Sequence, residues 1–339
     1  MCYKTKLLDN SQSSIEIAAE FLKKGEVVGI PTETVYGLAA NAFDENAVNK
    51  IFKAKGRPSD NPLIVHISSI DMLDELVREV PFLAKKCFEK FTPGPLTMIM
   101  PKSDKIPNVT SGGLDTVGIR MPSHKTARAI IDACGFPLAA PSANLSGSPS
   151  PTTAKHVFDD MNGRIPCIID GGFSAVGVES TVISFEDNAI RLLRPGFISV
   201  NDLKEITDNV LIDNGVLHML DKNAVVSSPG MKYKHYSPKA DVVIIDGKLE
   251  DFRQFVSSHK EENLWCMPFV KSDMTEIDIP FIAYGETSEE QAHNVFDVLR
   301  ELDNVGAKKV YARCPSINGV GLAVYNRLLR AAGFQVIKL

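Results

Sequence analysis

The chain has 339 residues, enough for two domains, and its 44% hydrophobic and 23% charged content is typical of a globular protein. A net charge of −5 excludes a protein that coats nucleic acid by bulk attraction, so any RNA contact would be weak and local. Six cysteines without a CxxC spacing, and a sequence without an apolar run of membrane-spanning length, predict a reduced, cytoplasmic protein with no zinc site and no membrane partner.

The first predicted elements are a helix at 13–24 and an apolar strand at 27–30. Pro31 ends the strand, because proline cannot donate to a sheet ladder, and a hydroxyl-rich turn follows. Asp44 is a good N-cap for the next helix, which is predicted to end at Gly56 among basic side chains. A loop with Asn61 then leads to a strand at 63–67. This combination of hydroxyls, cations, an amide and an imidazole (His66) suits a polyanion and a small polar partner.

Each of these groups also has a structural interpretation. Lys50 and Lys53 are typical of the solvated face of an amphipathic helix, and a single strand histidine is more often a hydrogen-bonded structural residue. Arg120 falls among apolar residues in a strand predicted at 116–121, where it needs an anionic partner because burying it unpaired is expensive. From the residues alone, a protein carboxylate is the more common partner and a substrate anion is the alternative.

The remaining elements of the first half interleave without a regular repeat. Ser111, Gly112 and Gly113 form a loop whose glycines allow close backbone approach to a bound group. The segment from Ser142 to Ser150 is either a polar loop or a ring of small hydroxyls around phosphates. Further helices are predicted at 71–77, 81–91, 123–134 and 153–160, and strands at 95–100, 138–140, 165–170, 179–185 and 190–193. This order predicts an α/β fold with a twisted, mixed sheet.

Composition changes after residue 197, and three parts are predicted: a catalytic domain at 1–210, a linker at 211–239, and a smaller Rossmann-like domain at 240–339. The last part lacks GxGxxG after its first strand, so no dinucleotide is assigned to it. Its predicted elements are strands at 241–245, 264–269, 281–284 and 308–313, and helices at 252–259, 288–302 and 320–332.

Several long motifs resemble one known family. They include PTETVYGL (31–38), KAKGRPSDNPLIVHI (53–67), FTPGPLTMIM (91–100), PLAAPSANLSGSPSPT (137–152), GVESTVI (177–183), LLRPG (192–196) and SPGMKYKHYSP (228–238). In this order they resemble the threonylcarbamoyl-adenylate synthases, the YrdC-like family of tRNA modification, in its longer two-domain form.

The resemblance implies a nucleotidyltransferase that joins L-threonine, bicarbonate or CO2, and ATP into threonylcarbamoyl-AMP and pyrophosphate. A downstream transferase would carry the threonylcarbamoyl group to tRNA, next to the anticodon. Mg²⁺ is expected to enter with ATP, held mainly by phosphate oxygens and water rather than by a protein metal site. Such a reaction requires positioning and charge neutralisation more than a protein nucleophile.

The resemblance also implies roles for individual residues. Arg120 would bind the threonine carboxylate, and the other threonine contacts would be Thr34, His66, Ala140 and Ser180. The implied ATP site comprises Lys53, Arg57, Asn61, Thr116, Ser142, Ser150, Arg194 and Tyr233, and Lys55 could serve similarly. Among these residues, Lys53, Arg57 and Arg120 would be catalytic. The linker around Tyr233 would be a lid over the nucleotide.

Two other functions fit parts of the sequence. A double-stranded-RNA-binding module would use the basic residues at 50–57, but basic residues are sparse elsewhere and the net charge is negative. The carbamoyl-adenylate-forming domain of hydrogenase maturation is related, but those chains are longer and carry cysteine-rich zinc motifs. The substrate distinguishes this enzyme from the main prediction. The hydrogenase-maturation enzyme would use carbamoyl phosphate, whereas the predicted synthase would use threonine plus bicarbonate.

Overall fold

The computed structural model describes residues 3–56, 61–218 and 236–339. The chain divides into two compact units. The first unit comprises Met1–Ser146, Ser150–Ala175 and Glu179–Lys232, and the second comprises Gly147–Pro149, Val176–Val178 and Tyr233–Leu339. Two short segments that precede residue 179 therefore belong to the second unit, so the division does not follow chain order.

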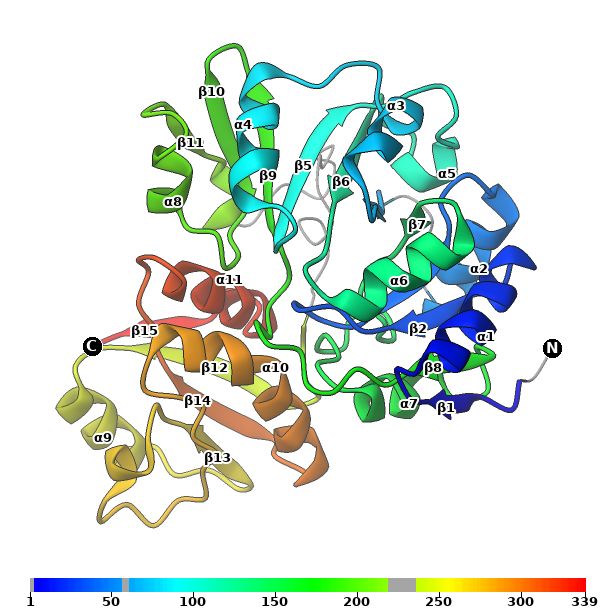
Figure 1. Ribbon diagram of the computed structural model, residues 1–339. Helices are drawn as coiled ribbons and strands as arrows, with labels where there is room; N and C mark the ends of the chain where they lie inside the picture. The colour runs from blue at the N-terminus through cyan, green and yellow to red at the C-terminus, as the bar shows by residue number, and fades with distance from the viewer. Residues whose placement is uncertain (1–2, 57–60, 219–235) are drawn as a thin grey trace. The chain divides into compact units, whose positions relative to one another are not determined.

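The described residues of the first unit form one 11-stranded mixed sheet with the order β1-β8-β2-β3-β7-β4-β6-β5-β9-β10-β11 (Figure 1). Its centre combines parallel and antiparallel pairs, as β4 and β6 run parallel whereas β3 and β7 run antiparallel. The strands are β1 Lys6–Leu8, β2 Val28–Ile30, β3 Gly37–Asn41, β4 Ile64–His66, β5 Leu96–Pro101, β6 Thr116–Arg120, β7 Leu138–Ala139, β8 Cys167–Ile169, β9 Thr181–Glu186, β10 Ala189–Arg194 and β11 Val210–Ile212. The twisted, mixed sheet predicted from the sequence is confirmed.

Eight helices accompany this sheet in the described residues: α1 Gln12–Lys23, α2 Glu45–Lys55, α3 Leu73–Leu76, α4 Phe82–Phe91, α5 Asn108–Ser111, α6 Lys125–Cys134, α7 Ala154–Met161 and α8 Val200–Lys204. Short 3-10 turns lie at Ile70–Met72 and Asn214–Val216. In α2 the Asp44 carboxylate caps Asn46 and Ala47, and Gly56 ends the helix with a φ of 63°. Both helix boundaries agree with the sequence prediction, because capping chemistry is local.

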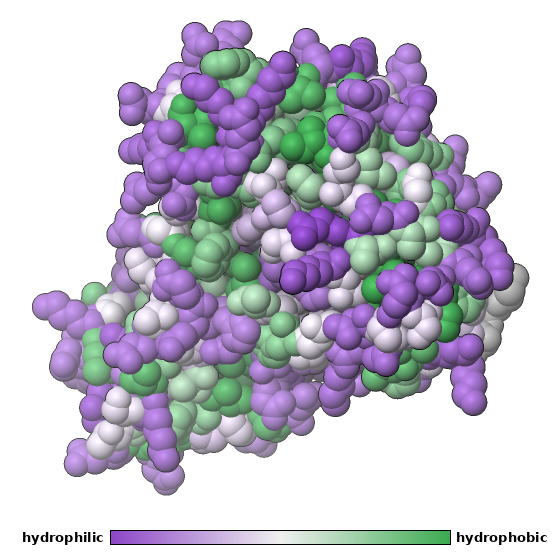
Figure 2. Space-filling model, viewed as in Figure 1, coloured by the Kyte–Doolittle hydropathy of each residue, from purple (hydrophilic) through white to green (hydrophobic). Residues whose placement is uncertain are grey.

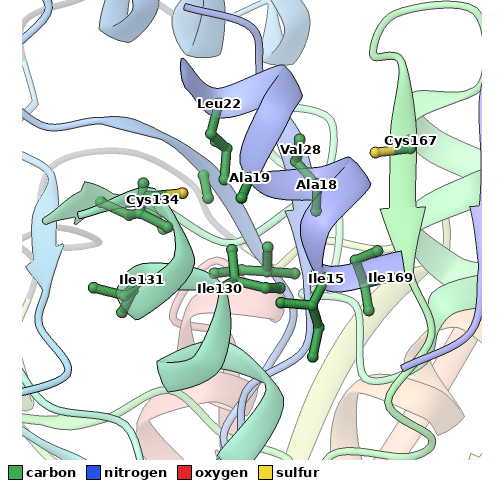
Figure 3. Close-up of a cluster of buried hydrophobic side chains, with 14 residues drawn as sticks. Ile15, Ala18, Ala19, Leu22, Val28, Ile130, Ile131, Cys134, Cys167 and Ile169 are labelled. Atoms are coloured by element: carbon green, nitrogen blue, oxygen red, sulfur yellow. The ribbon is translucent and has the colours of Figure 1, made fainter. Parts of the chain in front are cut away.

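Helices α1 and α6 pack side by side and bury one apolar core against the sheet. Figure 3 shows Ala18 and Leu22 of α1, Ile130 of α6 and Val28 of β2 within this cluster. Cys134 and Cys167 belong to the same core, and burial raises the pKa of each thiol to about 12. These cysteines therefore act as small apolar side chains.

The second unit is a smaller α/β unit around a parallel sheet with the order β13-β14-β12-β15. Its strands are β12 Asp241–Asp246, β13 Leu264–Met267, β14 Lys309–Arg313 and β15 Val336–Lys338, and its helices are α9 Leu249–Ser258, α10 Ser288–Asn304 and α11 Gly321–Ala331, with a 3-10 turn at Lys271–Met274. The smaller Rossmann-like unit is confirmed. The prediction of a strand at 281–284 is wrong, because only a single bridge joins Phe281 to Cys266. Strand β15 was not predicted.

Three strands of the first unit were also not predicted: β1, β3 and β11. The β3 sequence, GLAAN, contains no β-branched residue, so its pattern gives no strand signal. Its conformation follows from pairing with β2 on one side and β7 on the other. Tertiary pairing thus overrides local propensity here.

The viewed face is mostly hydrophilic, with smaller hydrophobic groups between charged side chains (Figure 2). Exposed Phe82 has Lys86 above its ring, at 4.8 Å from the ring centroid. Within residues 3–56, 61–218 and 236–339, no helix is long and apolar enough to cross a membrane.

Candidate functional site

A row of polar side chains crosses the middle of the apolar sheet. His66 and Arg120 are direct partners in the parallel pair of β4 and β6. Continuing the antiparallel register by one pair beyond Met98 and Ile119 places Thr97 of β5 opposite Arg120. Cross-strand partners share a face of the sheet, and all three residues are buried. The row ends at Ser180, whose hydroxyl lies 2.8 Å from the Thr97 hydroxyl.

The turn between β2 and β3 adds a carboxylate to this row. Glu33 and Arg120 are only 6% and 4% exposed, and Arg120 Nη2 lies 2.8 Å from Glu33 Oε1. Thr32 fixes the turn, because its hydroxyl lies 2.9 Å from the Thr34 hydroxyl and donates to the Val35 carbonyl at 2.6 Å. Arg120 therefore has a protein carboxylate as neighbour, as the residue pattern alone favoured.

This ion pair leaves much hydrogen-bonding capacity unused. Besides the ion pair of Arg120 Nη2 with Glu33 Oε1, no hydrogen bond of good geometry reaches the Glu33 oxygens, Nε of Arg120 or Nδ1 of His66 from the described residues. Buried polar atoms are almost always paired in native proteins, so a cluster of unpaired ones indicates a place for a ligand. Donors and acceptors are both present in this cluster.

The charges at this place are set by burial. Burial pushes the pKa of Glu33 upward, but the positive charge of Arg120 more than offsets this, so the pKa lies below its ordinary value and Glu33 is a carboxylate. Burial, aided by the charge of Arg120, lowers the pKa of His66 to about 3, so its imidazole is neutral. Burial also lowers the pKa of nearby His124. One positive and one negative charge thus face each other beside neutral imidazoles.

A second group of predicted residues meets at the start of β9. Arg194 donates to the Ser180 carbonyl and hydroxyl, both at 3.1 Å. The Ser150 hydroxyl donates to Glu179 Oε1 at 2.5 Å. Ser150 and Arg194, both implied for ATP, thus converge on the segment that carries Ser180, which is implied for threonine.

A third group surrounds the loop after β7. Buried Lys55 donates through Nζ to the carbonyls of Ser142 and Asn144, the latter at 2.8 Å. Lys53 lies on the exposed side of the same helix, where it lines a cavity of about 290 Å³ with Glu26, Lys50 and Arg164. The structure therefore brings Lys55, rather than Lys53, to Ser142, and the role of Lys53 stays a prediction.

Asn61 and Thr116 lie near the amino-terminal ends of two central strands. Asn61 precedes β4, and Thr116 is the first residue of β6. The parallel register of Ile64 with Gly118 places both residues at the same end of these strands, whereas Arg120 is at the other end of β6. Asn61 is fully buried, and both polar atoms of its side chain are unpaired within the described part of the chain. The expected close approach of the glycine loop is made to the chain itself: a Cβ at Gly112 would lie 2.8 Å from Pro62 N.

Two further residues predicted for threonine lie inside the described part of the first unit. Thr34 and Ala140 are buried, and the Ala140 N–H donates to the Ile64 carbonyl at 2.9 Å. Arg57 and Tyr233, with most of the predicted lid, lie outside the described residues. In the ranges that the structure describes, no group of three His, Cys, Asp or Glu side chains is placed to hold a metal ion.

Sequence reasoning gave no role to Glu33 and did not single out Asn144. Glu33 belongs to the quoted PTETVYGL motif but carried no signal of its own, because its partner lies on a distant strand. Lys55, which the resemblance implied as a further ATP residue, also has a local signal. A lysine on the apolar side of α2 is unusual, and Ala47, Val48, Ile51 and Ala54 mark that side.

The fold and site together define a mixed α/β protein with a buried cluster of charged and polar side chains on its sheet, next to loops rich in hydroxyl groups. The chain belongs to the Sua5/YciO/YrdC family. The family model described as "Telomere recombination" matches residues 20–196, and the model described as "Threonylcarbamoyl-AMP synthase, C-terminal domain" matches residues 198–333.

Relatives from distant organisms agree over nearly the full length. The threonylcarbamoyl-AMP synthase of Pyrococcus abyssi is 45% identical over 96% of this chain and 96% of its own. That of Bacillus subtilis is 42% identical over 98% of this chain and 97% of its own. The crystal structure of P. abyssi Sua5 complexed with L-threonine superposes with a TM-score of 0.93 at 42% identity, covering 99% of this chain and 100% of that one.

A shorter relative matches only part of this chain. The crystal structure of Escherichia coli YciO covers 57% of this chain and 96% of its own, with a TM-score of 0.51 at 25% identity. A fold of the first unit's kind therefore occurs in a chain without the second unit.

Proposed function

We propose that this protein is a nucleotidyltransferase that makes L-threonylcarbamoyl-AMP and pyrophosphate from L-threonine, bicarbonate or CO2, and ATP. Full-length similarity to proteins named threonylcarbamoyl-AMP synthase supports the reaction, and a relative complexed with L-threonine supports the amino acid. The observation in this chain that carries the proposal is the buried Glu33–Arg120 pair with its unpaired atoms beside neutral His66.

The proposed reaction has two steps. The threonine amine adds to CO2 and loses a proton, which gives a carbamate. A carbamate oxygen then attacks the α-phosphorus of ATP, and the bond to pyrophosphate breaks. No protein nucleophile is required, so the protein acts by proximity and charge stabilisation.

We assign the threonine carboxylate to Arg120, and the other polar groups of threonine to Thr34, His66 and Ser180. Neutral His66 can accept or donate a hydrogen bond without adding charge to the pocket. Because Arg194 and Ser150 converge on the segment of Ser180, ATP bound there would have its α-phosphate close to the carbamate. Mg²⁺ enters as part of the MgATP substrate, held by phosphate oxygens and water.

The product would feed a transferase that modifies tRNA next to the anticodon, and we place this activity in the cytoplasm. Five described cysteines are free thiols, four of them buried, which suits a reducing compartment. The relatives named above give no support to an RNA-binding module or a hydrogenase-maturation enzyme.

The direct test is pyrophosphate release from MgATP by the purified protein. Release should require both L-threonine and bicarbonate, and the product should carry the mass of threonylcarbamoyl-AMP. Carbamoyl phosphate should not replace threonine plus bicarbonate. Release that does not depend on threonine would contradict the proposal.

A further inference from the structure

Glu33 has no role in the assignments above, yet it is one of the most buried charged groups of the first unit. Its carboxylate and the Arg120 guanidinium lie 2.8 Å apart, and both side chains are at least nine-tenths buried. Burying two charges is expensive, and a buried ion pair seldom adds stability compared with apolar packing. A role in ligand binding would explain why this pair is present.

The unpaired atoms identify the chemistry of the ligand. Besides the ion pair of Nη2 with Oε1, Nε of Arg120 has no acceptor and Oε2 of Glu33 makes no hydrogen bond of good geometry within the described residues. A simple anion would pair with the guanidinium but leave Oε2 of Glu33 without a well-placed donor. A simple cation would do the reverse. A ligand with an anionic and a cationic group close together satisfies both.

Charge balance favours the same ligand. Arg120 and Glu33 together are neutral, and His66 and His124 add no charge. A bound carboxylate without an amine would leave one uncompensated negative charge in a buried site. A zwitterion adds no net charge, so the pocket stays neutral with and without it.

We propose that Glu33 binds the α-ammonium group of the amino acid while Arg120 binds its α-carboxylate. In an α-amino acid both groups are attached to one carbon atom, and Glu33 and Arg120 are at a matching short separation. The pair is thus a receptor for the zwitterion, and Glu33 makes the amine a condition of binding. This inference rests on the proposed function, since it names a further contact of the same substrate.

The test compares L-threonine with β-hydroxybutyrate, which keeps the carboxylate and the hydroxyl but lacks the amine. Calorimetric dissociation constants for both compounds give a preference ratio for each variant. Wild-type protein should prefer threonine by roughly 10-fold or more, as expected for a charge-assisted hydrogen bond. In Glu33→Gln the ratio should fall towards one, because the variant binds threonine more weakly and binds β-hydroxybutyrate with unchanged affinity.

A ratio that stays at the wild-type value in Glu33→Gln would overturn the proposal and leave Glu33 as a positioning residue for Arg120. A partly unfolded sample does not disturb this comparison, because both constants come from one preparation. Glu33→Asp is the second variant: it keeps the charge but withdraws the oxygens by one methylene group, so its ratio should also fall. Glu26→Gln, at a carboxylate beside Lys50, is the control and should keep the wild-type ratio. Failure of wild-type protein to bind threonine would instead contradict the proposed function.

Discussion

Arg120 has a buried carboxylate as neighbour, and this determines which substitution can test its role. Arg120→Ala would leave Glu33 buried without a counter-charge, at a cost of about 3–5 kcal/mol of stability. Arg120→Lys keeps the charge but loses the planar fork that binds a carboxylate through two hydrogen bonds.

We therefore expect Arg120→Lys to remain folded and to bind L-threonine about 10-fold more weakly or worse, with ATP affinity little changed. Calorimetry with each ligand measures both effects. Unchanged threonine affinity in a folded Arg120→Lys protein would remove Arg120 from the threonine site.

His66 makes stability depend on pH. Its pKa of about 3 in the folded protein lies below the ordinary value of 6.5, so below pH 6.5 the unfolded chain binds a proton that the folded protein does not. The stabilisation is complete above pH 6.5 and decreases as the pH falls towards 3, by about 1.4 kcal/mol per pH unit. His66→Gln should reduce this slope in urea unfolding between pH 7 and pH 5.

At the scale of elements, α2 presents its two lysines to opposite surroundings. Residues two apart on a helix are rotated by about 200°, so Lys55 faces the Ser142 loop and Lys53 faces the outer cavity. The buried ammonium group of Lys55 therefore holds this loop to α2 through two backbone acceptors.

Lys55→Met should release this loop and weaken ATP binding by roughly 10-fold or more, since each lost charge-assisted bond is worth about 1.5–3 kcal/mol. Lys53→Met is the matched variant on the same helix. If Lys53 belongs to the ATP site, this variant should also bind ATP more weakly. Unchanged affinity for Lys53→Met would exclude Lys53 from the ATP site, and unchanged affinity for Lys55→Met would show that the loop does not contact ATP.

The glycine pair after α5 provides a test of the Asn61 loop. Both Gly112 and Gly113 have positive φ, at 61° and 81°, so alanine costs about 1 kcal/mol or more at either position. Only at Gly112 would the added Cβ also collide with the backbone at Pro62, whereas nothing lies within 4 Å at Gly113. Gly112→Ala should therefore lower ATP affinity and melting temperature more than Gly113→Ala. Equal effects on ATP affinity would exclude Asn61 from the ATP site.

The elements that the sequence predicted well are those whose signals are local. The start and end of α2 follow from Asp44 and Gly56, and the buried strands follow from apolar runs. Pairings between distant segments were not predictable, so β3, β15 and the approach of Glu33 to Arg120 were missed. The residues of the site were visible in motifs, but their division into three groups required the strand register.

At the scale of the whole molecule, the second unit includes residues that adjoin the site in sequence. The segment 147–149 directly precedes Ser150, and 176–178 directly precedes Glu179 and Ser180. Within the second unit, Arg300 donates to the Pro149 carbonyl at 2.6 Å, and Ser237 N–H donates to the Gly147 carbonyl at 2.9 Å. At Gly177 a Cβ would lie 2.4 Å from His293 backbone atoms.

Arg300→Ala should therefore raise the KM for ATP several-fold, because Ser150 follows the segment that Arg300 holds. Arg253→Ala is the control: it also removes a guanidinium that donates to a backbone carbonyl, that of Thr275, but far in sequence from the site. Steady-state kinetics of both variants, with melting temperatures as a check on folding, give the comparison. An equal rise of KM in both variants would contradict a specific effect through Pro149.

This sharing of segments also sets an order of events during synthesis on the ribosome. The strands of the first unit leave the ribosome before Ser237, His293 and Arg300 have been translated, and N-terminal regions generally fold first. The contacts of Pro149 and Gly177 cannot form until Arg300 and His293 have emerged. The two serines that follow these segments therefore reach their final places late, and a nascent chain that stalls before the second unit carries an unfinished site.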